Sequence, residues 1–285
     1  MKAVVPMATR TKLKALCLSG GVAVFALASS HEAQAGEFSA SVGAAATMSP
    51  DYEGSNNAKL GGLPFLILSW QADAPTKSGL QVGLPDITLN LPGSLEVGVV
   101  KIHTTEGLYR LNLGLAYDGG RGQSDNAALK GMGEIGDHVL ASAAVNFEAK
   151  GTGWRSGLSL SRDISHETDG TVLDGRLGYV LPLNEALVLT TTGSASWADK
   201  NHMQSYFGVT QAQAAASSNA RFEARSGLKS MGIEAELNWT VNESWMLAGS
   251  LGYTRLMNDA AASPLVKTQG SPDQVNSMLA LIYTF

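Results

Sequence analysis

The sequence predicts an all-β protein, a transmembrane antiparallel β-barrel of about 12 strands with short periplasmic turns and longer extracellular loops. Large apolar residues alternate with polar or small ones in segments of about ten residues, the length that crosses a bilayer as a tilted strand. After the first thirty positions, no run of about 18 apolar residues interrupts the chain, which argues against a helical membrane protein. With 44% hydrophobic and 16% charged residues, the chain is also too apolar to be disordered.

Residues 1–35 have the pattern of a secretory signal peptide. A basic stretch that ends at Lys14 precedes an apolar run from Leu16 to Ala28, and Ala-Gln-Ala at 33–35 predicts cleavage between Ala35 and Gly36. Cys17, the only cysteine, lies in this segment. We therefore expect a barrel over residues 36–285 without disulfides or a cysteine nucleophile.

Removal of the signal peptide makes the charge balance more acidic. The 20 basic and 25 acidic residues of the chain lose four and one, respectively, which leaves 16 and 24 and a net charge of −8. Nucleic acid is a poor partner for such a surface.

Alternation in the run YRLNLGLAYD, 109–118, is the clearest in the chain, because Leu111, Leu113 and Leu115 all fall on one face. Similar patterns predict twelve strands, at 37–47, 60–71, 79–90, 94–102, 107–118, 138–149, 153–164, 171–181, 185–198, 227–241, 244–257 and 273–285. Short turns follow the even strands before the last, and long polar loops follow the first, fifth, ninth and eleventh. Both ends of the barrel segment therefore belong on the periplasmic side.

The placement of aromatic residues favours a barrel over a soluble β-sandwich, which also alternates. Two aromatic girdles around an apolar band suit a barrel in lipid, whereas a sandwich core has no reason to gather aromatics at strand ends. The predicted periplasmic girdle contains Trp70, Tyr109, Phe147, Trp154, Tyr179, Trp239, Trp245, Tyr283 and Phe285, and the outer one Tyr117, Trp197 and Tyr253.

The last residues, Leu279, Leu281, Tyr283 and Phe285, occupy alternate positions of the final strand. We expect this strand to pair with the first and so to remove the open edge of the sheet. The pattern also resembles the C-terminal signal of outer-membrane proteins, which implies recognition by the barrel-insertion machinery.

The loops carry a more specific resemblance. SPDYEGS (49–55), YDGGRGQSDNAALKGMGEIGD (117–137), YFGVTQAQAAASS (206–218) and AASPLV (261–266) occur in this order. Together they resemble the MipA/OmpV family of outer-membrane barrels, the MltA-interacting proteins. Where many members have acidic residues after Gly-Arg, this chain has Gly122 and Gln123. The resemblance implies an outer-membrane scaffold that links a lytic transglycosylase to a murein synthase.

Few residues have the pattern of a catalytic or metal site. His202 and Ser205 form H-x-x-S near Asp199, but nothing in the sequence orients a triad, so we interpret them as polar loop residues. Asp51 and Glu53 are carboxylates that can bind Ca²⁺, yet turn formation explains them better. His103, His138 and His166 lack metal-ligand spacing. We expect no enzymatic activity, cofactor or metal.

Two further features concern the interior. Thr210 and Gln213 fit a capping box before an alanine run, which predicts a helix over about 210–217 that either folds over the barrel mouth or only caps the surface. The polar strand faces predict a charged lumen, either plugged or open, lined by Glu96, Arg110, Glu148, Arg155, Asp174, Arg176, Glu234 and Glu236. A small-solute channel is therefore the alternative to the scaffold, and a barrel hydrolase based on His202 and Ser205 is a weaker one.

Overall fold

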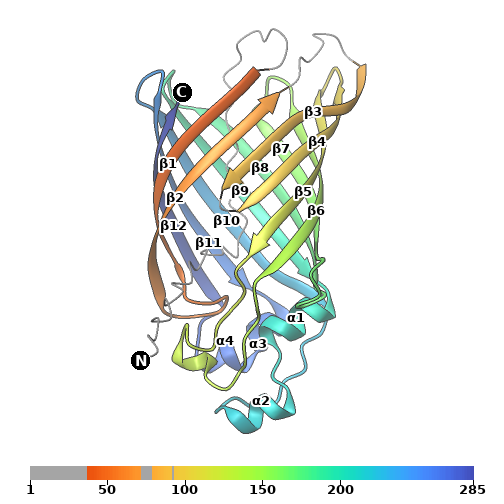
Figure 1. Cartoon of the computed structure of the whole chain (residues 1–285), viewed down its shortest axis with the longest axis vertical. Helices are drawn as coiled ribbons and strands as arrows, with labels where there is room; N and C mark the ends of the chain where they lie inside the picture. Colours follow the sequence, from red (N-terminus) through yellow and green to blue (C-terminus); the bar gives the residue numbers. More distant parts are fainter. Residues whose placement is uncertain (1–36, 72–78, 92) are drawn as a thin grey trace, which may run out of the picture.

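The computed structural model describes residues 37–71, 79–91 and 93–285, and this part of the chain forms a closed antiparallel barrel (Figure 1). Each strand pairs with the next along the chain, and the first pairs with the last. The predicted signal peptide and its cleavage site lie outside the described residues. The strands are β1 (Glu37–Pro50), β2 (Ala58–Gln71), β3 (Gly79–Leu91), β4 (Ser94–His103), β5 (Gly107–Asp118), β6 (His138–Ala149), β7 (Trp154–Asp163), β8 (Thr171–Pro182), β9 (Leu187–Ala198), β10 (Gly227–Thr240), β11 (Trp245–Leu256) and β12 (Asp273–Thr284).

The barrel forms because each strand presents one apolar and one polar or small face. In β5, Leu113 and Leu115 are 48% and 45% exposed on the outer face, while Arg110 and Asn112 alternate with them on the inner face. The pairing of β1 with β12 closes the sheet, and the backbone N–H of Phe285 donates to the carbonyl oxygen of Ala40 at 3.1 Å. The predicted barrel, its twelve strands and their order are thus confirmed.

The two ends of the barrel differ in their connections. Short turns and the C-terminus lie at the upper end in Figure 1, and the helices lie at the lower end. By the rule for outer-membrane barrels, we assign the upper end to the periplasm and the lower end to the outside. The helical elements are η1 (Ala127–Leu129), α1 (Lys200–Phe207), α2 (Gln211–Ala216), α3 (Asn258–Ala262) and α4 (Pro264–Lys267). No helix in the described part of the chain has the length and hydropathy of a membrane span.

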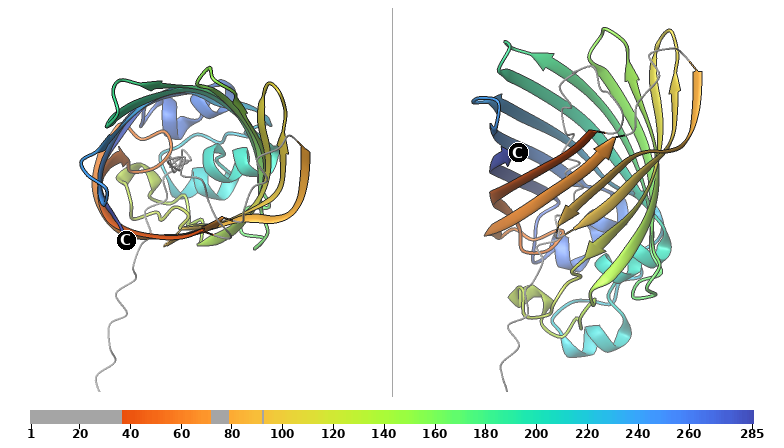
Figure 2. Two further views of the ribbon diagram at one scale, coloured as in Figure 1. Left: turned by 90° about the horizontal axis from the view of Figure 1, so that it is seen from above. Right: turned by 45° about the horizontal axis from the view of Figure 1, so that its top comes forward.

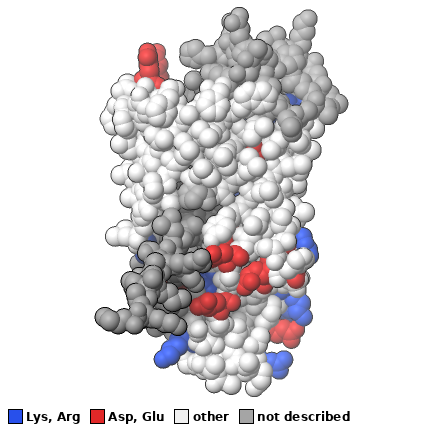
Figure 3. Space-filling view, viewed as in Figure 1, with Lys and Arg blue, Asp and Glu red and all other residues white. Residues whose placement is uncertain are grey.

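The outer surface carries a broad apolar band. On the face seen in Figure 3, charged side chains gather at the lower end, and little charge lies above them among the described residues. Large apolar side chains such as Leu158, Leu177 and Leu251 are more than half exposed on this band. An exposed apolar band of this kind is what a bilayer covers.

The orientation makes a labelling prediction. Asn242 lies in the exposed turn between β10 and β11, and Ser218 lies exposed in the long loop at the opposite end. In intact cells, we expect an impermeant thiol reagent to label Ser218→Cys and to leave Asn242→Cys unlabelled until the outer membrane is permeabilised. The opposite labelling pattern would reverse the orientation.

Candidate functional site: the outer plug and the inner wall

Four long loops meet across the outer mouth of the barrel, and we call residues 51–57, 119–137, 199–226 and 257–272 together the plug. Viewed along the barrel axis, the helices of these loops lie across the opening (Figure 2, left). The sequence predicted the long loops but not their association.

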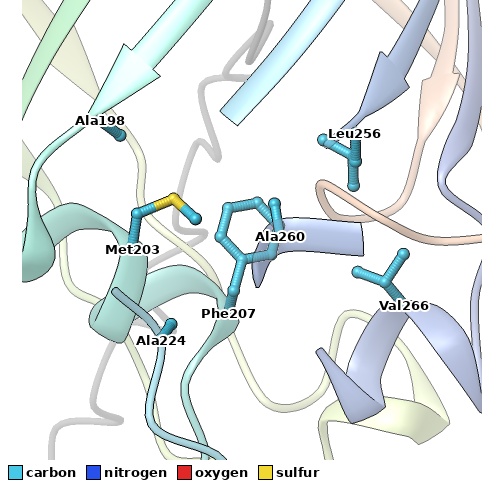
Figure 4. Packing of buried hydrophobic residues seen from close by; sticks show 7 residues of the cluster. All are labelled: Ala198, Met203, Phe207, Ala224, Leu256, Ala260 and Val266. Atoms are coloured by element: carbon cyan, nitrogen blue, oxygen red, sulfur yellow. The ribbon is translucent and has the colours of Figure 1, made fainter. Parts of the chain in front are cut away.

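An apolar cluster anchors the plug to the barrel wall. Met203 and Phe207 of α1 pack with Ala260 of α3 and Val266 of α4, and all four side chains are fully buried (Figure 4). Ala198 and Leu256, the last residues of β9 and β11, belong to the same cluster. Burial of this apolar surface therefore stabilises the loops against the strands from which they emerge.

A second apolar cluster joins all four loops of the plug. Tyr52, Leu129, Val209 and Leu265 each come from a different loop, and each is at most 5% exposed. The phenolic hydroxyl of Tyr52 donates to the carbonyl oxygen of Leu265 at 3.0 Å. Because each loop contributes to this cluster, we infer that the plug is a single packed unit rather than four separate loops.

The SPDYEGS motif holds the first loop against the rest of the plug. Gly54 has φ +102°, and its N–H donates to Oε1 of Gln274 at 3.0 Å. A Cβ atom at Gly54 would overlap Val266, so both its conformation and its packing require glycine. The Glu53 carboxylate lies 3.0 Å from Nζ of Lys229, and Nδ2 of Asn126 donates to Asp51 at 2.9 Å.

These contacts give both carboxylates of the motif a structural role. Asp51 and Glu53 have different partners, which is the arrangement of loop anchors rather than of a shared cation site. Within residues 37–71, 79–91 and 93–285, no three His, Cys, Asp or Glu side chains group closely enough to hold a metal ion.

Arg121 is the buried cation of the plug, with a side chain that contacts the C-terminal end of α1. Its Nη1 donates to the carbonyl oxygen of Tyr206 at 2.6 Å, and its guanidinium lies 6.0 Å from the centre of the Tyr206 ring. Burial lowers the pKa of Arg121, while the nearby Tyr206, Tyr52, Glu53 and Asp125 raise it. The carbonyl oxygens at a helix C-terminus favour a cation, which explains why an arginine is held here.

The structure does not assemble a catalytic triad from the H-x-x-S pair. His202 and Ser205 lie in α1, and Asp199 caps this helix by accepting from the backbone N–H of His202 at 2.9 Å. The His202 ring stacks on Tyr206 with the ring centres 4.6 Å apart. The ring is partly buried, and its Nε2 atom is fully enclosed in the plug, which the loop sequence did not indicate.

The other histidines lie apart, and two of them have polar partners. His138 is buried at the start of β6, with Nδ1 3.0 Å from the carbonyl oxygen of Gly136. His166 is exposed, and its Nδ1 lies 2.7 Å from Asp169. His103 ends β4 at the periplasmic side.

The predicted capped helix is present as α2. Thr210 accepts from the N–H of Gln213, and the Gln213 side chain accepts from the N–H of Thr210, so the capping box is complete. Nε2 of Gln213 also donates to the carbonyl oxygen of Met132 at 2.6 Å, and Ala214 packs against the second cluster. Of the two expected arrangements, α2 therefore belongs to the plug as its outermost layer (Figure 1).

The strand register places the predicted lumen residues on the inner face, where cross-strand partners share one side of the sheet. These residues are Glu96, Arg110, Glu148, Arg155, Asp174, Arg176, Glu234 and Glu236. The structure pairs Arg110 with Glu148 at 2.6 Å, and Glu148, Arg155 and Arg176 line one hollow of the wall. Nδ2 of Asn238 donates to Glu236. Glu96 lies opposite Gly114 of β5, and Asp174 lies two residues before Arg176 on the same face of β8.

The predicted girdle residues lie at the strand ends. At the short-turn end, rings pair across strands as Tyr109 with Phe147, Trp154 with Tyr179, and Trp245 with Tyr283. The exposed rings there also include Trp70, Trp239 and Phe285, and near the plug they are Tyr117, Trp197 and Tyr253. The membrane role of these residues stays a prediction.

A family comparison fits this combination of barrel and loops. The model of the family described as MltA-interacting protein MipA matches residues 42–285, which is nearly all of the described chain. The chain belongs to the MipA family. No curated protein matches the sequence.

Solved structures similar to this MipA family member are outer-membrane barrels of low sequence identity. The outer membrane channel DcaP of Acinetobacter baumannii is 9% identical, with a TM-score of 0.43, over 88% of this chain and 97% of that one. OmpT of Vibrio cholerae is 7% identical, with a TM-score of 0.42, over 90% and 99%. The COG4313 outer membrane channel of Pseudomonas putida F1 is 12% identical, with a TM-score of 0.39, over 89% and 97%.

Sequence reasoning missed four residues on which the plug depends, Tyr52, Arg121, His138 and Lys229. Tyr52 and Arg121 both stand inside the loop motifs that carry the family resemblance. An aromatic residue and an arginine in otherwise polar loops were a usable signal of packing. Nothing local marks His138 and Lys229, because their roles depend on contacts between distant loops.

Proposed function

We propose that this MipA family member is an outer-membrane scaffold for murein-processing enzymes and meets them at its periplasmic rim. The observation that carries the proposal is the plug, whose loops pack together across the outer mouth through two apolar clusters. The name of the family, MltA-interacting protein, supplies the class of partner. The absence of a triad at His202 in the described chain supports a binding role over a hydrolytic one.

The periplasmic rim has the form of a shallow contact surface. Its described turns are short, and Glu106, Lys150, Glu185 and Glu243 are all exposed on them. Lys77, which we also expect at this rim, lies outside the described residues. Short turns cannot enclose a deep pocket, so the contact with an enzyme is polar and transient.

We expect joint neutral replacement of Glu106, Lys150, Glu185 and Glu243 to lower the recovery of murein hydrolase and synthase several-fold. Recovery is measured by co-purification from crosslinked envelopes, and heat-modifiable migration checks that the barrel still inserts. The matched control replaces three acids and one base on the outer loops, namely Glu134, Asp137, Glu167 and Lys130, which are also exposed. Equal recovery of the murein enzymes with the rim variant and with the outer-loop control would contradict the scaffold proposal.

A small-solute channel is the second candidate, because the inner wall carries charges of both signs, including the Arg110–Glu148 pair. A constitutive channel predicts steady conductance in planar bilayers at neutral pH. It also predicts that the rim replacement leaves this conductance unchanged. The scaffold requires neither result.

A further inference from the structure

The plug holds a titratable group without a counter-charge of its own at its contact with the loop between β7 and β8. The His202 ring stacks on Tyr206, and the backbone of Gly170 packs against its Cβ atom, so that a Cβ atom at Gly170 would lie 2.8 Å from it. Its Nε2 atom is buried and makes no hydrogen bond within the described chain. A buried and unsatisfied imidazole nitrogen accepts a proton only with a large loss of solvation.

The charges around His202 make protonation harder. Lys229 of β10 and His138 of β6 are its nearest basic neighbours, and Arg121 lies beyond Tyr206. The acids of the surrounding elements already have partners. Glu53 is 3.0 Å from Lys229, Asp118 is 3.8 Å from His138, and Asp199 accepts the backbone N–H of His202. Burial, followed by the charges of Lys229 and His138, lowers the pKa of His202 well below its usual range.

The position of His202 couples this proton to the plug. The next residue, Met203, and Phe207 of the same helix are buried in the cluster that fixes α1 to the barrel wall. If α1 moves away from the barrel wall, the His202 ring becomes exposed to water. The pKa of His202 then returns to its ordinary value of about 6.5. The open plug therefore binds more protons than the closed plug at any pH between the two pKa values.

The direction of the effect follows from linkage. The stability that neutral His202 gives to the closed plug is fully present above about pH 6.5 and is lost as the pH falls below it. One proton linked to opening changes the ratio of open to closed molecules by at most about tenfold per pH unit. The inner wall of the barrel behind the plug carries charges of both signs, which is the lining expected of a water-filled pore.

We propose that this barrel is an acid-opened pore, in which protonation of His202 releases α1 and the plug from the outer mouth. This function goes beyond the scaffold role and does not depend on it. We expect small ions to pass through the opened lumen, because charged side chains of both signs line the inner wall.

The test is single-channel recording of the purified barrel in planar bilayers between pH 7.5 and 4.5. We expect rare openings at pH 7.5 and an open fraction that rises up to about tenfold per unit below about pH 6.5. His202→Phe keeps a ring against Tyr206 but cannot bind a proton, so its open fraction should not change with pH. The matched control, His166→Phe, alters an exposed loop histidine and should behave like the wild type.

A second measurement keeps the proposal testable if His202→Phe folds poorly. Ala260 is fully buried in the plug and Ser218 is exposed, and the only cysteine of the sequence, Cys17, lies in the predicted signal peptide. The ratio of labelling rates of Ala260→Cys to Ser218→Cys should rise at acid pH. His202→Gln should abolish the rise. A wild type that stays closed at pH 4.5, or a His202 variant that opens with the wild-type pH profile, would overturn the proposal.

Discussion

We expect replacement of Phe207 by alanine to release the plug from the barrel wall, while the barrel itself stays inserted in the membrane. Phe207 is the last residue of α1, and its fully buried ring packs against α3 and α4 of the last loop. Loss of a buried phenylalanine side chain typically costs about 3–5 kcal/mol, because the cavity left behind is not refilled. Of the described strand residues, only the last ones of β9 and β11, Ala198 and Leu256, are buried in this cluster, so we expect the cost to fall mainly on the association of the loops.

Hydrogen exchange of the α1 amides, residues 200–207, measures this effect directly. We expect the free energy of opening to fall by about 3 kcal/mol or more, which is roughly a hundredfold faster exchange. Frequent openings in planar bilayers should accompany it at neutral pH. The control is Phe38→Ala, since Phe38 is 63% exposed on the outer face of β1. Unchanged protection of α1 in Phe207→Ala would mean that the first apolar cluster does not hold α1 against the barrel wall.

The fold could be predicted almost completely because a bilayer imposes a local rule. Each strand must place an apolar side chain outward at every second position, and β5 shows this with Leu111, Leu113 and Leu115. The alternation stops where the strand leaves the bilayer, so the pattern also fixes strand length. Predicted β5 and β6 have the bounds that the structure gives them.

The plug could not be predicted in the same way. Its contacts join residues more than a hundred positions apart, such as Tyr52 with Leu265. The loop helices are short and carry no strong periodic pattern, and only α2 has a complete capping box, the signal that predicted it. His202 is the clearest example of a contact that the sequence does not predict. The pattern H-x-x-S is the same whether the loop is exposed to water or packed against other loops, as it is here.

The barrel seam is the other place where a single substitution has a large expected effect. Gly43 of β1 pairs with Ile282 of β12 on one side and with Phe65 of β2 on the other. The inner wall is tightly packed here, with Ala45, Ala280 and Ile282 buried beside Phe65. The Phe65 ring occupies the space that a side chain at Gly43 would need.

We expect Gly43→Val to impair closure of the barrel. A Cβ atom at Gly43 would overlap Cζ of Phe65 and lie 2.7 Å from the carbonyl oxygen of Leu281, which is a backbone atom of the seam. The ring can rotate away, but the backbone contact requires β12 to move, and overpacking of this kind costs about 1–3 kcal/mol or more. Urea titration of the refolded barrel should therefore show a lower midpoint, and less heat-modifiable protein should accumulate in membranes.

Gly62→Val is the matched control for this seam variant. Gly62 lies on the neighbouring strand β2, and a Cβ atom there meets only the carbonyl oxygen of Ala45, at 3.8 Å. The valine adds the same side chain and the same β propensity, so its midpoint and insertion yield should match the wild type. Equal losses in the two variants would show that glycine is needed for strand flexibility in general. A loss confined to Gly43→Val places the constraint at the seam, where β12 must approach β1 closely enough to close the sheet.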